Sequence, residues 1–413
     1  MVRPRESQWY RYPSVKLETL APPEAMAGLQ AWSGLLEQAS EPSIFLSPEW
    51  IRAWWGAYGG GGHEARLWAA RDAKGELWGL APLYVRRVRL AGLVNARVIG
   101  VMGDEGVGSE YLGLLVRPGR EAEFLSALAE VLAGDWAVLD FRGLPEGGAL
   151  ARLIPEILGA RARERIHCER RPCVRVLLPD DYETYLRTLK PKFRSTLRYR
   201  TNRLLKNYAV RLLRTSREEE LGAHLDRFFA MHQERWQARG LPGSFHDPRM
   251  RAFYRDVAAA FLCRGWLRFY HLEVDGVTRA SQFGFAFGGV LHSLQEAFEY
   301  SFCPPSVGGL GVILRGMVIR ESIREGLKTY YFLGGLQDSK TRWGTSTHYV
   351  QRIRLGAAGY AGCLAFALTA GWDMTKDWGR THLPEWVLKA RRRWRSRRPP
   401  SPGRQAPEEM VGR

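Results

Sequence analysis

The chain has 413 residues, which is long for a single hydrophobic core and predicts two domains or one large domain. Hydrophobic residues make up 45% of the chain and charged residues 25%, proportions that exclude a disordered or fibrous protein. The formal net charge is +18, from 61 Lys and Arg against 43 Asp and Glu. A field of that sign attracts anions such as phosphates, nucleic acid or an anionic membrane face.

The cysteines and the apolar segments bear on the compartment. Five cysteines occur, and none lies in a C-x-x-C pair or near a histidine at zinc-finger spacing. We therefore expect no bound metal and a reducing compartment. Residues 1–18 lack the apolar core of a signal peptide, and the longest apolar stretch, 357–372, is too short to cross a bilayer. These features predict a cytoplasmic protein.

The first half of the chain shows signals for both helices and strands. A helix start is indicated at Ser47, an N-cap residue followed by Pro48 at the first helical position. Residues 72–75 carry a hairpin signal between two strand-like runs. The predicted helices are 23–38, 48–58 and 120–132, and the predicted strands are 66–70, 77–85, 111–116 and 136–141.

The second half repeats this order of elements. Strands are predicted over 266–274 and 280–287, joined by a hairpin at Asp275 and Gly276, and are followed by a strand over 290–298, a helix over 312–325 and a strand over 329–333. A basic helical segment, 182–207, and a helix, 218–239, lie between the halves. This order predicts an α/β (α+β) fold with an internal duplication.

A glycine-rich turn before the 312–325 helix is the first candidate site. Glycines let the backbone approach a ligand closely, and a helix N-terminus offers free N–H groups and a positive dipole end to a phosphate. The alternative is a loop that only turns the chain. The candidate phosphate-binding residues are Ser306, Val307, Gly308, Gly309, Leu310 and Gly311.

A polar cluster follows the last predicted strand. Lys340 and Arg342 could steady a developing oxyanion, and Asp338 could accept a proton from an attacking amine. The alternative is that these three side chains pair with one another. Trp343 joins them as a candidate substrate contact, although a tryptophan is more often part of a core.

Further candidates come from the basic helix and from the central strands. Arg194 and Arg198 can share one helix face and contact phosphates or an anionic polymer, although a charge run is usually a solvated surface. Gln282 is a candidate substrate contact and Glu299 a candidate general base, each on or beside a strand. Strand alternation predicts that Gln295 and Glu299 face one side of the sheet and Glu296 the other.

Several motifs in order along the chain resemble a known family. They are the Gly-Ser-Glu-Tyr-Leu segment at 108–112, the K-F-R-x-x-L-R run at 192–198, the R-W-x-x-R-G segment at 235–240 and the F-L-x-G…K-x-x-W-G end at 332–344. The chain resembles the FemAB-like branch of the GNAT superfamily, in particular the CelD-type (BcsL) acetyltransferases, over roughly 40–355. Lys340 matches the lysine of the terminal motif.

The resemblance implies a fold and an activity. We expect two tandem GNAT-like domains, each a mixed, mostly antiparallel sheet flanked by helices, over 41–170 and 171–355. A lead-in of 1–40 precedes them, and a helical, basic and partly disordered tail of 356–413 follows. The resemblance also implies transfer of an acyl group from acyl-CoA to an amine acceptor, in a family linked to exopolysaccharide and cell-envelope synthesis. The donor turn departs from the Tyr-Ser-Pro-Gly-like pattern of relatives, which leaves the identity of the donor open.

Two other functions stay open at this point. Distant Fem relatives take aminoacyl-tRNA and extend cell-wall peptides, and the net charge of +18 agrees with such a partner. Apart from tRNA, a nucleic-acid partner is not expected. Alternatively, the chain is a non-catalytic module that binds a polysaccharide-synthase partner, an anionic polymer or the inner membrane face through its Arg-rich tail.

Overall fold

The structure is a computed structural model that describes residues 15–20, 29–90, 94–104, 106–133, 136–159, 165–304, 307–359 and 362–369. Within these ranges no helix is both long and apolar enough to cross a membrane. The elements of the first unit are β1 (Glu18–Thr19), α1 (Leu29–Gln38), η2 (Ile44–Leu46), α2 (Pro48–Tyr58), β2 (His63–Arg71), β3 (Leu77–Leu90), β4 (Val94–Val101), β5 (Leu115–Val116), α3 (Glu121–Val131), β6 (Val138–Pro145) and α4 (Ala149–Ile157).

The second unit begins with a long strand and ends with another. Its elements are β7 (Ile166–Leu177), α5 (Tyr182–Thr188), α6 (Pro191–Asn207), β8 (Val210–Arg214), α7 (Glu218–Gln237), η4 (Ser244–His246), α8 (Pro248–Cys263), β9 (Tyr270–Val274), β10 (Val277–Phe287), β11 (Val290–Phe298), α9 (Leu310–Arg324), β12 (Thr329–Tyr331), α10 (Asp338–Thr341) and β13 (Ser346–Gly356).

The predicted duplication is confirmed by the strand pairing. In the first unit the β2–β3 hairpin is followed by β4, which pairs in parallel with β6 after the α3 crossover. In the second unit the β9–β10 hairpin is followed by β11, which pairs in parallel with β12 after the α9 crossover. Each unit thus has a mostly antiparallel sheet with one parallel pair.

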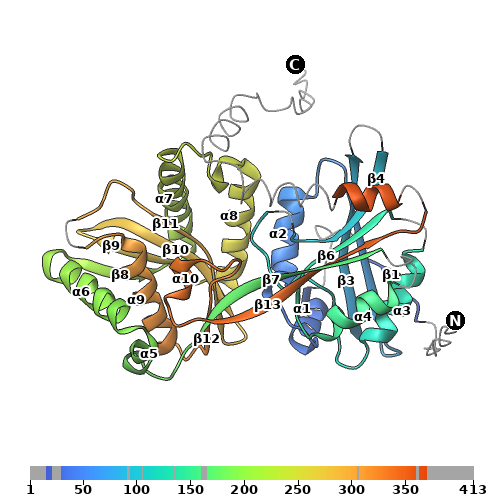
Figure 1. The fold of residues 1–413 in the computed structure, drawn as a ribbon, viewed down its shortest axis with the longest axis horizontal. Coiled ribbons are helices and arrows are strands. Elements are labelled where there is room, and N and C mark those ends of the chain that lie inside the picture. Colours follow the sequence, from blue (N-terminus) through green and yellow to red (C-terminus); the bar gives the residue numbers. More distant parts are fainter. Residues whose placement is uncertain are drawn as a thin grey trace, which may run out of the picture.

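The two predicted sheets are joined into one. In the described residues the strand order is β1-β2-β3-β4-β6-β13-β7-β12-β11-β10-β9-β8, with β5 on β3. The joint is β13, which pairs with β6 of the first unit on one edge and with β7 on the other. In Figure 1 β7 and β13 run side by side from one lobe into the other. The division expected at 170/171 falls inside β7 and stays a prediction.

Several predicted elements were misplaced. The strand expected over 111–116 is only Leu115–Val116, because Tyr111 has a φ of 54°, which an extended strand does not allow. The basic segment is two helices, α5 and α6, because Pro191 excludes the helical conformation at Lys190, whose ψ is 135°. Residues 266–269 precede β9 rather than belonging to it. In the expected tail, residues 362–369 are helical and 370–413 lie outside the described residues.

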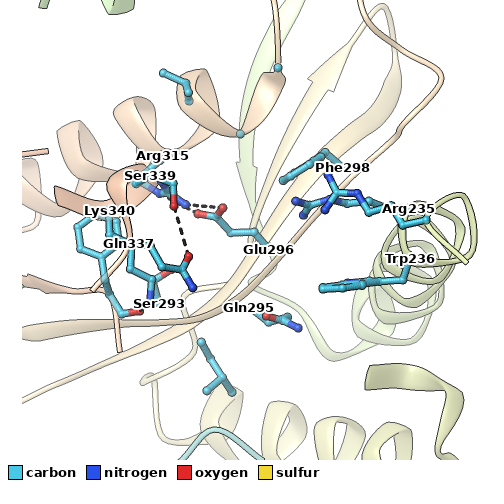
Figure 2. Close-up of a pocket in the computed structure, with 16 residues that line it drawn as sticks. Arg235, Trp236, Ser293, Gln295, Glu296, Phe298, Arg315, Gln337, Ser339 and Lys340 are labelled. Carbon is cyan, nitrogen blue, oxygen red and sulfur yellow. Dashed lines mark hydrogen bonds and ion pairs between the residues drawn. The ribbon is translucent and has the colours of Figure 1, made fainter. Parts of the chain in front are cut away.

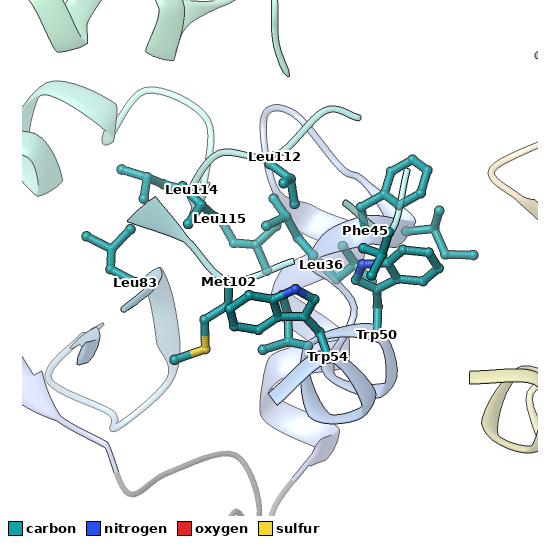
Figure 3. Close-up of a cluster of buried hydrophobic side chains, with 14 of the residues drawn as sticks. Leu36, Phe45, Trp50, Trp54, Leu83, Met102, Leu112, Leu114 and Leu115 are labelled. Carbon is teal, nitrogen blue, oxygen red and sulfur yellow. The ribbon is translucent and has the colours of Figure 1, made fainter. Parts of the chain in front are cut away.

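Buried aromatic rings hold the two units together. Trp50 of α2 contacts Phe253 of α8 at 4.9 Å between ring centroids and Phe285 of β10 at 5.6 Å. Phe45 packs edge-on against Trp50 at 5.0 Å. Around Trp50 and Trp54 the cluster continues into Leu36, Met102 and the leucines of the first unit (Figure 3). Burying this apolar surface fixes α2 against α8 across the boundary between the units.

Candidate functional site

A cavity lies where the parallel strands of the second unit separate. β11 and β12 pair as far as His292 and Tyr331; β11 then continues to Phe298, while the chain leaves β12 through Leu333, which has a φ of 53°. The fork opens into a cavity of about 590 Å³ (Figure 2). The lining residues are Arg235, Trp236 and Arg239 of α7 and its end; Ser293, Leu294, Gln295, Glu296 and Phe298 of β11; Gly309, Gly311, Val312 and Arg315 around the start of α9; and Phe332, Gln337, Ser339 and Lys340 after β12.

The start of α9 opens directly onto this cavity. Gly309 is the N-cap residue, no side chain caps the helix, and the first turn carries no acidic residue. The first N–H groups of a helix have no partner within the helix, so they are available to a ligand. A Cβ on Gly309 would meet no atom within 4 Å. Gly308 has a φ of 68°, and a Cβ there would lie 3.0 Å from the guanidinium carbon of Arg200.

The cavity is electropositive. Among its described lining residues Glu296 is the one carboxylate, and Arg315 pairs with it at 2.6 and 3.0 Å. Burial lowers the pKa of Arg315, but Glu296 and Tyr330 together outweigh burial, so the pKa is raised. Arg235, Arg239 and Lys340 also line the cavity, so its positive charges outnumber the single carboxylate. Positive charge beside a helix N-terminus suits a ligand that carries phosphates.

A buried histidine orients two lining residues. His232 of α7 is 1% exposed, and its Nε2 accepts a hydrogen bond from Trp236 Nε1 at 2.9 Å. Burial lowers the pKa of His232 to about 4, so the ring is neutral at pH 7. The amide nitrogen of Gln295 lies 2.9 Å from the same Nε2 and donates to it, which leaves the Gln295 carbonyl oxygen for the cavity.

The predicted alternation along β11 is confirmed by these contacts. Gln295 reaches α7, and Glu299 pairs with Arg227 of the same helix at 3.2 Å, whereas Glu296 reaches Arg315 of α9. α7 and α9 therefore cover opposite faces of the sheet, as Figure 1 shows. The cavity passes from one face to the other through the fork between β11 and β12.

Lys340 supports the loop that follows β12. Its Nζ donates hydrogen bonds to the carbonyl oxygens of Phe332 at 3.2 Å, Leu333 at 2.6 Å and Gly334. The left-handed conformation of Leu333 turns these successive carbonyls toward one ammonium group. Burial lowers the pKa of Lys340. Lys340 thus fixes the wall of the cavity as well as lining it.

Part of the predicted donor site lies at this cavity. Gly309, Gly311 and Lys340 line it, and Gly308 forms the turn in front of α9. Val307 and Leu310 are instead packed in the hydrophobic core beneath α9. Ser306 lies outside the described residues.

Three predicted residues lie beside the cavity on the surface or in ion pairs. Asp338 and Arg342 are exposed, and Arg342 Nε donates to the Asp338 carbonyl oxygen at 3.2 Å. Glu299 is held by Arg279 at 2.6 Å and by Arg227. None of the three is among the described lining residues.

The other predicted contacts are not among the described residues that line the cavity. Trp343 is fully buried and packs edge-on against Phe193 at 5.0 Å. Gln282 is fully buried, and its Oε1 accepts from Tyr330 at 2.9 Å. Arg194 is partly exposed on α6, and Arg198 is exposed and pairs with a neighbouring carboxylate, Glu183.

A polar cluster between the two units was not predicted. The Tyr331 hydroxyl lies 2.9 Å from Glu110 Oε2, 2.6 Å from the Tyr111 hydroxyl and 2.7 Å from His348 Nε2. Cys173 Sγ donates to the same Glu110 oxygen at 3.3 Å. Burial raises the pKa of Glu110. Glu110 and Tyr111 come from the first unit and the other three residues from β7, β12 and β13.

Sequence signals for the missed residues existed. Arg235, Trp236 and Arg239 are the conspicuous residues of the R-W-x-x-R-G segment, and Glu110 and Tyr111 belong to the 108–112 segment. Both segments served to identify the resemblance and were not assigned to the site. Their contacts depend on packing between elements far apart in the chain.

At the equivalent point of the first unit, buried charges of opposite sign pair with one another. β4 and β6 pair as far as Gly100 and Asp140, and the buried Asp140 carboxylate accepts from Arg352 at 2.6 and 2.7 Å. Arg142 donates to the same carboxylate at 2.7 Å. The first residue of α3 is the buried acid Glu121, which would repel a phosphate. The start of α9 in the second unit carries no acidic residue in its first turn, unlike the start of α3.

Comparison with known proteins agrees with this geometry. The family model described as "Acetyltransferase (GNAT) domain" matches residues 191–341, a segment that contains every described residue lining the 590 Å³ cavity. This chain contains a GNAT domain. The first unit repeats the topology of this GNAT domain, so the chain is built from two GNAT-like units.

Solved structures share the fold of the whole chain. The crystal structure of FemX has a TM-score of 0.55 at 13% identity, and the match covers 81% of this chain and 96% of FemX. A conserved protein of unknown function from Bacteroides thetaiotaomicron has a TM-score of 0.53 at 12% identity, covering 83% of this chain and 99% of that one. No curated protein sequence matches the chain. These matches extend over both units, so the arrangement of the two units is also found in FemX.

Proposed function

We propose that the GNAT domain transfers an acyl group from acyl-CoA to an amine acceptor, with the donor in the 590 Å³ cavity. The observation that carries the proposal is the uncapped N-terminus of α9, which opens onto a cationic cavity in the fork between two parallel strands. A Cβ at Gly308 would press on Arg200, and the space beside Gly309 is open, so the turn suits the close approach of a pyrophosphate.

The residues of the fork have separate tasks in this proposal. Gly308, Gly309, Gly311 and Arg200 would hold the donor phosphates. Lys340 would keep the loop after β12 in place and present positive charge where an oxyanion develops. When bound, the donor supplies an acyl carbon activated as a thioester. On the resemblance to CelD-type proteins, we place the acceptor among amines of exopolysaccharide or cell-envelope synthesis, on the cytoplasmic side.

Calorimetric titration tests the donor site directly. We expect acetyl-CoA or a longer acyl-CoA to bind the full chain with measurable heat, and Gly309→Trp to abolish binding because the indole fills the cavity mouth. Gly222→Trp is the matched control, since Gly222 is an exposed glycine of α7 at which an added Cβ would also meet no atom within 4 Å. Absence of heat with every acyl-CoA, or equal binding by the two variants, overturns the proposal.

A second candidate donor is an aminoacyl-tRNA. The observation in its favour is the exposed basic face of α6, which carries Lys192, Arg203 and Lys206. Binding through phosphate contacts weakens steeply as salt rises, because counterions are released. A steep salt dependence of tRNA binding together with no acyl-CoA binding would favour this donor. A role for the Arg-rich tail rests on residues outside the described ranges, and deletion of 390–413 tests it.

A further inference from the structure

The helix α6 presents a basic surface beside the donor cavity. Its sequence contains six Lys and Arg residues and no Asp or Glu. At 1.5 Å per residue, a helix of 17 residues is about 25 Å long. In Figure 1 α6 lies along the outer side of the second unit, next to α9. Since the buried residues of the helix are Leu197 and Leu204, most of its length faces outward.

Three exposed cations of α6 have no ion-pair partner among the described residues. They are Lys192, Arg203 and Lys206. Arg198, by contrast, pairs with Glu183. Like charges gathered on one helix repel one another, so an anionic partner that covers them is favoured by electrostatic complementarity.

Large apolar side chains are exposed among these cations. Tyr199 is 57% exposed and Leu205 is 49% exposed. Tyr199 lies two turns from both Lys192 and Lys206 and one turn before Arg203, so the four share one side of the helix. Tyr and Arg side chains together are typical of protein interfaces. An RNA surface would stack bases on several rings, whereas α6 exposes one, which favours a protein partner.

This basic face borders the turn at which the donor would bind. A Cβ on Gly308 would lie 3.0 Å from the guanidinium carbon of Arg200, which belongs to α6. A Cβ on Gly316 of α9 would lie 3.0 Å from the side chain of Leu197. α6 is therefore packed along the helix whose start opens onto the donor cavity, and a partner that covers α6 lies beside the glycine turn.

Two kinds of molecule present an acyl thioester on a phosphopantetheine arm, namely CoA and the small acidic acyl carrier proteins. The donor cavity would recognise the arm in either case. Beyond its arm, CoA adds only a nucleotide, which covers a small part of a helix about 25 Å long. The length of the basic face and its exposed Tyr199 and Leu205 instead match the surface of an acidic protein.

We infer that the exposed face of α6 docks an acidic acyl carrier protein, whose acylated phosphopantetheine arm enters the donor cavity past Gly308. This inference rests on the proposed acyl transfer and names the partner that delivers the acyl group. Carboxylates of the carrier protein would face Lys192, Arg203 and Lys206. The phosphate of the arm would lie at the uncapped start of α9.

Isothermal titration of the full chain with octanoyl-CoA and with a purified octanoyl-acyl carrier protein tests the inference. Arg203→Glu should weaken binding of the carrier protein at least tenfold at low salt and change the affinity for octanoyl-CoA less than threefold. Arg152→Glu is the matched control and should change neither affinity. Arg152 is an exposed arginine of α4 in the first unit, also without an ion-pair partner among the described residues.

Two further measurements separate docking from general charge attraction. Tyr199→Ser keeps the net charge and should weaken binding of the carrier protein at least fivefold. The apo carrier protein, which lacks the arm, should bind at least fivefold more weakly than the octanoyl form, because the arm alone reaches the start of α9.

Several results would overturn the inference while octanoyl-CoA still binds. They are no binding of the carrier protein, wild-type binding of it by Arg203→Glu or Tyr199→Ser, equal weakening of both donors by Arg203→Glu, and equal binding of the apo and octanoyl forms. Binding of tRNA or of phosphatidylglycerol vesicles through Arg203 in place of the carrier protein would also overturn it. If octanoyl-CoA does not bind either, the proposed function fails instead.

Discussion

The charge at the start of α9 offers a test that separates electrostatics from shape. Gly309 has φ −69° and ψ 129°, a conformation that Asn and Asp adopt as N-cap residues. Gly309→Asp and Gly309→Asn place side chains of nearly equal size in the same open space. Both can accept a hydrogen bond from the first helical turn, so both should leave the free energy of unfolding within a few tenths of a kcal/mol of wild type or raise it.

The two variants should differ strongly in donor binding. A phosphate bound at the N–H groups of the first turn would lie about 6 Å from a carboxylate at position 309. At an effective dielectric constant of about 20, two unit charges at that distance repel by about 3 kcal/mol. That energy corresponds to about a 100-fold change in Kd. Salt screening reduces it, so the Asp variant should bind at least tenfold more weakly than the Asn variant at moderate ionic strength.

Isothermal titration with one acyl-CoA at two salt concentrations measures this difference. The gap in affinity between the Asp and Asn variants should narrow as salt rises, while thermal unfolding shows both to be folded. Equal donor affinities for the two variants at low salt would refute the reasoning, because they would mean that no donor phosphate lies at the start of α9.

Two further predictions concern stability. Burial lowers the pKa of His292 to about 3, so between pH 6.5 and 5 the unfolded chain binds a proton that the folded chain does not, and stability falls as pH falls. His292→Phe should remove about 2 kcal/mol of that loss, measured by urea unfolding at the two pH values, and an unchanged pH dependence would contradict it. Asp140→Asn should cost about 3–5 kcal/mol, because Arg352 is 5% exposed and its buried charge would lose the carboxylate that accepts two of its hydrogen bonds. Arg198→Gln, which breaks an exposed ion pair, should cost less than about 1 kcal/mol. Urea unfolding of both variants measures the two losses, and equal losses would refute the argument.

The sequence predicted most of what depends on neighbouring residues. Ser47 and Pro48 mark the start of α2 because capping and a fixed φ act within one turn, and Ser47 accepts from the Trp50 N–H at 3.2 Å. The alternation of Gln295 and Glu296 follows from the pleat of a strand. The duplicated order of elements and the glycine turn before α9 were also visible in the pattern of residues.

Tertiary structure alone decided the contacts that make the candidate chemistry. Tyr331 and Glu110 are 221 residues apart and meet because β13 joins the two sheets. Lys340 was chosen from a motif, but its bonds to the carbonyls of 332–334 depend on the left-handed turn at Leu333. Strand pairing and helix packing are set by the complementarity of whole surfaces, which a local window of sequence does not contain. The sequence therefore determined the units and the glycine turn before α9, and the packing of the two units determined which residues meet at the junction between them.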